Sequence, residues 1–335
     1  MNRDAVSSSA IDARPRVGFI VGPTGAGKTA VAIKVAERSG AEIVNADSRQ
    51  IYRLMDIGTA KPSPEELRRV RHHLIDLRNP DEPLDVTAFE RLARAAIAEI
   101  SSRGRPVLVV GGSGLYIRVL RDGIFQGPAA DPALRVRLAA RAAAIGTPAL
   151  HAWLHELDPT AAERISPNDL IRITRALEVY ELTGTPISEH HARHRFSSGR
   201  YRSLTIGITP PRELLYEAIN RRFDAMIEAG FVEEVKRLID AGYGRGTAFT
   251  TTGYRELAAY LRGELDLASA IEGAKRESRR LAKRQLTWFR ADPAITWLDG
   301  CTEADQALRL FAAFFAPRDE PTIGENDANE PEQHP

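Results

Sequence analysis

The sequence predicts an α/β fold in which a parallel sheet is flanked by helices and interrupted by an all-helical inserted subdomain. Short apolar runs alternate with stretches of helical period over residues 16–130, a pattern typical of parallel strands joined by crossover helices. From about Asp131 to His194 only short helical stretches occur, separated by Pro and Gly. A strand-forming run, "SLTIGI", then returns, so we interpret the helical block as an insertion.

The elements of the first part are predicted from the apolar period and from the residues that stop it. "RVGFIVG" is an apolar run bounded by Pro and Gly and is predicted to be a buried strand, followed by a helix over "KTAVAIKVAERSG" that ends at Gly40. "AEIVNAD", which ends at Asp47, and "HHLIDL" are the next two predicted strands. A helix over "DVTAFERLARAAIAEISSRG" leads to the apolar strand "RPVLVVGG", which runs into "SGLYIRVL".

The rest of the chain is predicted to be helical except for two strands. The insertion holds "DPALRVRLAARAAAIG", "TPALHAWLHELD", "PTAAERI" and "NDLIRITRALEVYELTG". After "SLTIGI" come further helices, the last a long one through "RQLTWFR", and a final strand in "AITWLD". We divide the chain into a disordered leader (1–15), the first part of the core (16–130), the helical insertion (131–200), the remainder of the core with the C-terminal helices (201–317) and a disordered acidic tail (318–335).

The composition is that of an ordinary globular protein and narrows the possible functions. The net charge of +1 gives no overall field that indicates a nucleic-acid partner, so such a partner requires a local basic patch. Cys301 is the only cysteine, which excludes a disulfide framework and fits the reducing cytosol. No apolar run reaches the roughly 18–20 residues of a membrane span, and the leader lacks the apolar core of a signal peptide. We expect a cytoplasmic monomer, since nothing in the sequence requires a dimer.

The first chemistry-bearing motif is a glycine-rich phosphate loop between the first predicted strand and helix. It matches G-x-x-x-x-G-K-[ST] and comprises Gly22, Pro23, Thr24, Gly25, Ala26, Gly27, Lys28 and Thr29. The glycines let backbone N–H groups converge on phosphate oxygens, Lys28 supplies a mobile positive charge, and the Thr29 hydroxyl is a ligand for Mg²⁺. The motif therefore predicts a P-loop NTPase-like core that binds a polyphosphate, without fixing which one.

A carboxylate is predicted to lie beside this loop. Asp47 follows the second strand, at the edge where open α/β sheets bind their ligands, and Ser48, Arg49 and Gln50 come directly after it. A carboxylate at this place is a candidate general base. Two other roles stay open from the residues alone: Asp47 caps the following turn, or it holds Mg²⁺ through water.

The strand "VLVV" ends in Gly111 and Gly112, where a Walker B motif would carry Asp. Asp76 in "HHLID" is a weak substitute for that residue. The glycine pair allows the close approach of a ligand, and Ser113 offers a hydroxyl at the start of the next helix. The alternative is a tight turn in which Ser113 is only an N-cap.

A basic helix near the C-terminus predicts contact with a polyanion. At 100° per residue, one half of this helix carries Lys275, Arg276, Arg279, Arg280, Lys283 and Arg284. Glu277 falls in the other half. Cations with no acidic residue among them favour contact with a polyanion, the alternative being a solvated face. Arg135, Arg172 and Arg175 add positive charge to the insertion, and the histidines show no metal-ligand spacing.

Together these stretches resemble one family, the bacterial tRNA dimethylallyltransferases, also called isopentenyl-tRNA transferases. The matching segments span roughly residues 17–299 and are "GPTGAGKT", "NADSRQIYRLMDIGTAKP", "HHLIDL", "VGGSGLYI", "ISPNDLIRITRALEV", "NRRFDAMIEAGFVEEV", "TTGYRE" and "AKRQLTWFR". "DSRQIYRLMDIGTAKP" and "AKRQLTWFR" are far more specific than the phosphate loop. Where the family usually has Thr in "GGTGLY", this chain has Ser113, which keeps the hydroxyl and loses a methyl group.

The resemblance implies transfer of a dimethylallyl group from dimethylallyl diphosphate to N6 of the adenosine 3′ of the anticodon in tRNA, with release of pyrophosphate. It implies that the phosphate loop, Mg²⁺ on Thr29 and Arg222 bind the diphosphate, that Asp47 accepts the N6 proton, and that Ser113 orients the amine or the diphosphate. The target base must leave the anticodon-loop stack to react.

The resemblance also implies a set of contacts with the tRNA anticodon stem-loop. The residues so assigned are Asp47, Ser48, Arg49, Gln50, Ser113, Arg135, Ile171, Arg172, Ile173, Thr174, Arg175, Thr252, Gly253, Tyr254 and Arg255. The basic helix adds expected contacts with RNA phosphates through Arg276, Arg280, Lys283 and Arg284.

Two other functions remain compatible with the residues. A P-loop small-molecule kinase with a helical lid would turn over ATP and have no affinity for tRNA, but the missing Walker B Asp argues against it. A non-catalytic RNA-binding P-loop protein would bind tRNA without chemistry, and Asp47 at the sheet edge argues against that function.

Overall fold

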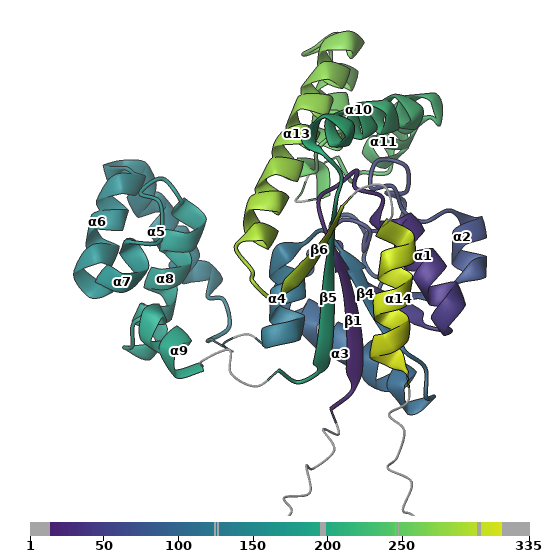
Figure 1. Ribbon diagram of the computed structural model, residues 1–335. Helices are drawn as coiled ribbons and strands as arrows, with labels where there is room; N and C mark the ends of the chain where they lie inside the picture. The colour runs from purple at the N-terminus through teal and green to yellow at the C-terminus, as the bar shows by residue number, and fades with distance from the viewer. Residues whose placement is uncertain are drawn as a thin grey trace, which may run out of the picture.

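Six parallel strands form the centre of the molecule (Figure 1). The structure, a computed structural model, describes residues 14–123, 125, 127–194, 199–244, 246, 248–299 and 303–316. The strands are β1 (Arg16–Val21), β2 (Glu42–Asn45), β3 (His72–His73), β4 (Val107–Gly111), β5 (Arg202–Thr209) and β6 (Ile295–Asp299). Their order in space is β3-β2-β4-β1-β5-β6, with every neighbouring pair parallel. The loops that follow the strands therefore meet at one edge of the sheet.

Helices cover both faces of this sheet. α1 (Lys28–Ser39) and α14 (Glu303–Phe315) pack on one face, and α3 (Val86–Ser102) and α4 (Gly114–Asp122) on the other (Figure 1). Alternation along β1 explains the arrangement, because successive side chains of a strand point to opposite faces. Ile20 belongs to the apolar cluster of α1 and α14, whereas Phe19 and Val21 belong to that of α3 and α4.

Four helices extend the core beyond the carboxyl edge of the sheet: α10 (Arg212–Glu228), α11 (Phe231–Asp240), α12 (Tyr254–Leu261) and α13 (Leu267–Arg290). They share an apolar cluster with the segment that follows β2, in which Ile51 and Met55 pack with Phe231 and Tyr254. A short 3₁₀ turn, Ala248–Thr250, precedes α12, and α2 (Pro64–Arg69) lies between β2 and β3. The loop after β2 is thus held between the sheet and these helices.

A separate group of helices stands beside the sheet (Figure 1). It comprises α5 (Pro132–Ile145), α6 (Thr147–Leu157), α7 (Pro159–Ala162), α8 (Leu170–Thr183) and α9 (Ile187–His194). These helices have an apolar cluster of their own, which includes Leu138, Leu154 and Leu177. The group leaves the sheet after α4 and returns to it at β5.

The predicted fold class is confirmed, because a parallel sheet is flanked by helices and an all-helical group lies between β4 and β5. The prediction of a strand over all of "HHLIDL" is wrong: β3 ends at His73, since Leu74 and Asp76 adopt φ of +64° and +56°, outside the strand region. Residues 1–13 and 317–335, for which disorder is predicted, lie outside the described residues, as does Cys301. Within the described ranges, no helix has both the length and the apolar character needed to cross a membrane.

Candidate active site

A cavity of about 550 Å³ opens at the carboxyl edge of the sheet, where the loops after β1, β2 and β4 meet α10 and α13. The residues with predicted functions that line it are Thr24, Lys28, Thr29, Asp47, Ser48, Arg49, Gln50, Ser113, Arg222, Thr252 and Arg284. The fold thus brings the predicted diphosphate site and most of the predicted reaction site to one place.

The phosphate loop has the conformation that its glycines allow. Gly25 and Gly27 adopt φ of +80° and +82°, in the left-handed region that favours glycine. A Cβ on Gly22 would meet the carbonyl oxygen of Ile208 at 2.3 Å, so a larger residue does not fit beside β5. Lys28 lies within the loop, where its Nζ donates a hydrogen bond to the carbonyl oxygen of Pro23 at 2.8 Å. Because α1 begins at Lys28, the helix adds the positive potential of its N-terminus.

Two desolvated cations face this end of the cavity. Burial lowers the pKa of Lys28 to about 8, with Asp47 opposing that change and Arg222 adding to it. Burial also lowers the pKa of the Arg222 guanidinium, against the opposing effect of Asp47. Arg222 Nη1 donates to the hydroxyl of Thr24 at 3.5 Å. One carboxylate does not offset two desolvated cations, so this end of the cavity favours a ligand with more than one negative charge.

Asp47 and Ser113 belong to neighbouring loops at the ends of β2 and β4. The Ser113 hydroxyl accepts a hydrogen bond from the backbone N–H of Ser48 at 3.0 Å and donates to the hydroxyl of Ser48 at 3.2 Å. Ser113 is at the N-cap position of α4, but its side chain makes no capping bond, so the alternative of a plain N-cap is wrong. Asp47 Oδ1 accepts from the N–H of Arg49 at 2.8 Å. Asp47 therefore caps its turn and also lines the cavity, and capping alone does not account for its place.

Gln285 on α13 joins the two halves of the cavity and is the main site residue that sequence reasoning missed. Its Oε1 accepts from the N–H of Thr24 at 2.8 Å, and its Nε2 donates to the carbonyl oxygen of Gly112 at 2.9 Å. A Cβ on Gly112 would lie 2.5 Å from that Nε2, so the glycine is needed for this approach. The available signal was an amide within "AKRQLTWFR" that falls, at 100° per residue, among the apolar residues Ala282, Trp288 and Phe289.

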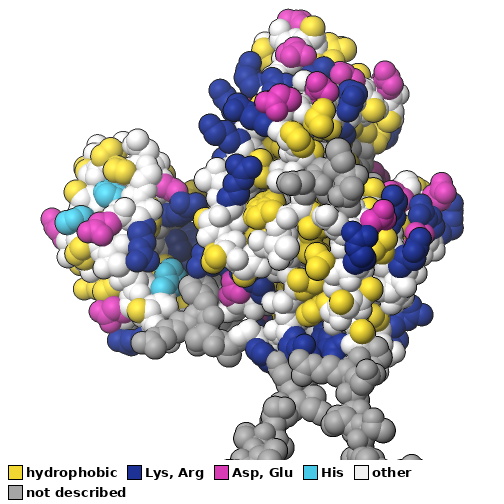
Figure 2. All heavy atoms as spheres, viewed as in Figure 1, with side chains coloured by type: hydrophobic (Ala, Val, Ile, Leu, Met, Phe, Trp, Pro, Cys, Tyr) yellow, Lys and Arg dark blue, Asp and Glu magenta, His cyan; other side chains and the backbone are white. Residues whose placement is uncertain are grey.

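A second, strongly basic cavity of about 940 Å³ lies between α4, α13 and the helical insertion. Its cationic lining residues are Arg118, Arg121, Arg172, Arg280, Lys283 and Arg284, and its two acidic ones, Asp122 and Asp292, both pair with Arg121. Figure 2 shows Lys and Arg side chains along the edge of α13 that faces the insertion. Gly114 and Arg284 line both cavities, so the two adjoin. Trp288, which is 40% exposed, also lines the second cavity and offers an aromatic surface for a base.

The basic half of α13 is partly neutralised within the protein. Lys275 pairs with Asp224 at 2.6 Å and with Glu272 at 3.3 Å. Glu277 lies outside the basic half, as the helical period predicts, but Arg280 still pairs with it at 2.6 Å, because long side chains three residues apart reach each other along a helix. Of the six cations named for this half, three exposed ones make no ion pair with a described residue: Arg276, Lys283 and Arg284.

The predicted RNA contacts of the insertion divide between surface and interior. Arg135 and Arg175 both bind the buried carboxylate of Glu178, at 2.8 and 2.6 Å. Ile171 is 84% exposed, but Ile173 is fully buried in the core of the helical group. Arg172 is exposed and Thr174 half-buried. Ile173 therefore has no surface for a direct contact, and its predicted role would have to act through α8.

The segment "TTGYR" shows the same division. Thr252 lines the first cavity, and Arg255 is exposed and pairs with Glu256. Gly253 is buried with φ of +92°. Tyr254 is fully buried, so a direct contact with RNA is not open to its side chain.

The donors in the first cavity fit a magnesium ion bound together with a diphosphate. Among the described residues, no group of three or more His, Cys, Asp or Glu side chains could hold a metal ion. Thr29 and Asp47, however, place a hydroxyl and a carboxylate in the same cavity. Mg²⁺ bound with substrate phosphates needs only one or two protein oxygens, the other positions being taken by phosphate and water.

Comparisons with known proteins agree with one another. The model of the IPP transferase family matches residues 50–292. The chain is similar to tRNA dimethylallyltransferase 2 of Syntrophus aciditrophicus (strain SB), with 48% identity that covers 90% of this chain and 97% of the relative. It is also similar to the crystal structure of the full-length tRNA isopentenylpyrophosphate transferase of Bacillus halodurans, with a TM-score of 0.68, 40% identity and coverage of 90% and 97%. A eukaryotic dimethylallyltransferase acting on tRNA gives a TM-score of 0.77 at 26% identity, with coverage of 89% and 78%.

Proposed function

The chain belongs to the IPP transferase family, and we propose that it transfers a dimethylallyl group from dimethylallyl diphosphate to N6 of the adenosine 3′ of the anticodon in tRNA. The family resemblance and the transferase class predicted from the motifs are confirmed by the relatives. The identity of the donor and the roles of single residues belong to the proposal.

One structural observation supports this function independently of the family match. A single cavity holds two desolvated cations, Lys28 and Arg222, together with a carboxylate and a hydroxyl, Asp47 and Ser113. The cations suit a leaving diphosphate, and the second pair suits an amine that must lose a proton. No carboxylate follows β4, where Gly111 and Gly112 stand instead, so the site lacks the Walker B residue of a kinase. This arrangement supports prenyl transfer over phosphoryl transfer.

The diphosphate end would act on the leaving group. The loop N–H groups, Lys28 and Arg222 would bind the diphosphate oxygens, on which negative charge grows as the allylic C–O bond breaks. Thr29 would hold Mg²⁺ there, and the ion, when bound, would supply further charge neutralisation. Gln285, through the N–H of Thr24, would fix the loop relative to the acceptor end. Pyrophosphate then leaves with the electron pair of the broken bond.

The acceptor end would act on the nucleophile. The N6 amine is weak because its lone pair is delocalised into the purine ring. Asp47 would accept a hydrogen bond from the N6 amine and then take a proton from N6 as the N6–C bond forms. The new N6–C bond replaces the allylic C–O bond that is broken. Ser113, which is held by Ser48, would orient the amine. The base reaches this site only after leaving the anticodon-loop stack.

The second cavity would hold the RNA around the flipped base. Its cations suit phosphates, and Trp288 suits a base face. Since this cavity adjoins the first at Gly114 and Arg284, RNA bound there would lie next to the reaction site.

The deciding experiment offers the protein two donors and two RNAs. Unmodified tRNA is incubated with Mg²⁺ and either labelled dimethylallyl diphosphate or labelled ATP, and the RNA is digested to nucleosides. We expect prenyl label in adenosine from the native sequence and none from a tRNA with guanosine at that position. ATP hydrolysis stimulated by tRNA, without prenyl transfer, contradicts the proposal.

A further inference from the structure

The segment "DIGTA", residues 56–60, forms a tight turn beside the first cavity and is held in an unfavourable backbone conformation. Ala60 adopts φ of +47° and the nearby Leu54 adopts φ of +66°, and such non-glycine residues persist only where their surroundings fix them. Ala60 N–H donates to the carbonyl oxygen of Ile57, and Lys61 N–H to that of Asp56. Gly58, Thr59 and Ala60 line the cavity, so the turn forms part of the wall of the site.

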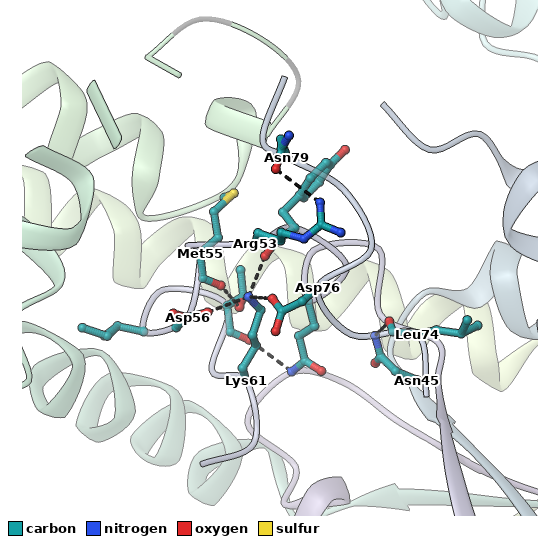
Figure 3. A network of polar contacts seen from close by, with 12 residues as sticks. Asn45, Arg53, Met55, Asp56, Lys61, Leu74, Asp76 and Asn79 are labelled. Carbon is teal, nitrogen blue, oxygen red and sulfur yellow. Dashed lines mark hydrogen bonds and ion pairs between the residues drawn. The ribbon is translucent and has the colours of Figure 1, made fainter. Parts of the chain in front are cut away.

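One side of the turn is fixed by Lys61 (Figure 3). Its ammonium, with the side chain only 6% exposed, donates to the carbonyl oxygen of Tyr52 and to Asp56, both at 2.6 Å, and to Asp76 at 2.5 Å. The three protons of the ammonium thus have three acceptors. These bonds join the turn to the strained segment that follows β3.

The other side is fixed by Glu234 of α11. Its Oε2 accepts from the backbone N–H groups of Asp56 at 3.0 Å and Ile57 at 2.8 Å, and its Oε1 accepts from that of Gly58 at 3.2 Å. The hydroxyl of Tyr254 donates to the same Oε1 at 2.6 Å. Glu234 is 3% exposed, and a buried carboxylate with four donors is a strong and specific anchor.

Close packing makes this anchor specific to the observed turn. A Cβ on Gly58 would meet the ring of Phe231 at 2.2 Å and that of Tyr254 at 2.5 Å. The backbone of the turn therefore lies directly against two aromatic rings that also contact each other, with centroids 4.9 Å apart. Burial raises the pKa of Tyr254 far above its ordinary value, so the hydroxyl remains a donor to Glu234 at any pH the fold tolerates.

The free end of the turn holds a residue of the site. Gln50 Nε2 donates to the carbonyl oxygens of Ala60 at 2.9 Å and Thr59 at 3.3 Å. Two carbonyl oxygens can be satisfied only by the NH₂ group of the amide, which fixes which way the amide points. Gln50 lines the cavity, and its Oε1 is then the atom that a ligand meets, as an acceptor only.

We propose that Glu234 is a positioning residue for the reaction: its carboxylate fixes the turn 56–60, and the turn fixes the amide of Gln50 as a hydrogen-bond acceptor for a nucleobase N–H of the substrate RNA. The inference rests on the proposed function, since an RNA base is the ligand. It assigns a role to "FVEEV" and to the buried Tyr254 of "TTGYR", none of whose side chains lines the first cavity.

The test uses Glu234→Gln, which keeps the size of the side chain. It replaces one carboxylate oxygen by an NH₂ group, so that two hydrogen-bond donors then face each other. Tyr254→Phe, a milder variant, removes only the hydroxyl, and Glu233→Gln is the matched control, because Glu233 is exposed on the same helix. We expect Glu234→Gln to lower kcat/KM for tRNA by about tenfold or more, because small displacements at a reaction site are costly. Tyr254→Phe should have a smaller effect and Glu233→Gln almost none. The Kd of dimethylallyl diphosphate without tRNA should stay within about twofold in all three, since the phosphate loop is untouched.

A double-mutant cycle with Gln50→Ala separates positioning from general stability. If Glu234 acts through Gln50, adding Glu234→Gln to Gln50→Ala should cost less than about twofold more, whereas independent effects multiply. Multiplied effects overturn the inference, and so does a lower melting temperature with normal kcat/KM at temperatures where the variant is folded. Hydrogen exchange of residues 56–60 is measured in parallel: Glu234→Gln should accelerate it and Glu233→Gln should not. Hydrogen exchange tests the inference even if the wild-type protein transfers no prenyl label. The absence of transfer would contradict the proposed function alone. Exchange that is unchanged in Glu234→Gln would contradict the inference.

Discussion

Lys28 of the phosphate loop and Arg222 of α10 lie close enough that the charge of Arg222 lowers the pKa of Lys28. Each cation is desolvated, and the carboxylate of Asp47 is the charge that opposes the fall in pKa of both. Like charges this close are unfavourable in the free protein and become favourable once a polyanion lies between them. The free site therefore stores electrostatic energy that a diphosphate releases on binding.

The first prediction concerns pH and the affinity for dimethylallyl diphosphate. With a pKa of about 8, Lys28 is charged below pH 8 and loses its charge above it in the free protein. The bound diphosphate favours the charged form, so binding takes up a proton above pH 8 and affinity must fall as pH rises, by up to about tenfold per pH unit. Calorimetric titration without tRNA, in buffers of different ionisation enthalpy, measures both the Kd and the proton uptake.

Lys28→Arg is the control for this prediction, because a guanidinium stays charged throughout the range. Its affinity should be weaker, since the side chain fits the loop less well, but should change little with pH. A wild-type profile as flat as that of Lys28→Arg would show that the titration of Lys28 does not control binding.

The second prediction concerns proton transfer. Asp47→Asn keeps the acceptor that binds the N–H of Arg49, so the turn should stay folded, but the amide cannot take the N6 proton. Single-turnover prenyl transfer at saturating substrates should fall by about 10²–10⁴, while tRNA affinity stays near that of wild type. Activity that recovers at high Mg²⁺ would assign Asp47 to the metal instead. A near-normal rate would remove it from the chemistry.

The third prediction concerns the RNA surface of α13. Arg276→Gln with Lys283→Gln removes two exposed cations that have no ion pair with a described residue. Binding of tRNA should weaken, and its salt slope should drop by roughly 0.7–0.9 for each phosphate that the variant no longer neutralises. The control, Lys34→Gln with Arg38→Gln, removes two exposed cations of α1, a helix that lines neither edge of the second cavity. Equal salt slopes in the two double variants would make the α13 cations an ordinary solvated surface.

More of the sheet and of the reaction centre than of the RNA-binding surface could be predicted from the sequence. Asp47 and Ser113 could be placed together because parallel strands end at one edge, a rule that needs no side-chain packing. Gln285 could not be placed, since its bonds to Thr24 and Gly112 depend on where α13 crosses the sheet. The helical period places Glu277 outside the basic half, and only the structure shows that Arg280 still pairs with it, because long side chains three residues apart reach each other along a helix.

Family motifs also mix residues that bind with residues that pack. Ile173 and Tyr254 lie inside motifs assigned to RNA, but both are buried, and only the structure separates these two kinds of position. "HHLIDL" is apolar enough for a strand, but Leu74 and Asp76 adopt positive φ and leave the strand conformation. In this conformation the carbonyl oxygen of Leu74 accepts from Asn45, and the carboxylate of Asp76 accepts from Lys61.

The last prediction concerns the bridge between the two ends of the cavity. Gln285→Leu removes the acceptor for the N–H of Thr24 and the donor to the carbonyl oxygen of Gly112, leaving two partly buried backbone groups unpaired, each at a cost of roughly 1–3 kcal/mol. The phosphate loop and the loop that carries Ser113 should then shift relative to each other, so the diphosphate affinity and the single-turnover rate should both fall, by about tenfold each. Gln285→Glu keeps the acceptor but not the donor, and it adds a negative charge beside the phosphates, so it should bind the diphosphate more weakly than Gln285→Leu. Thr287→Ala serves as the control for both measurements at saturating tRNA, because among the described residues that exposed hydroxyl bonds to the carbonyl oxygen of Lys283 in its own helix, and Thr287 lines the second cavity and not the first. If Gln285→Leu matches Thr287→Ala in both measurements, α13 only packs against the active site and does not align the diphosphate end of the cavity with the acceptor end.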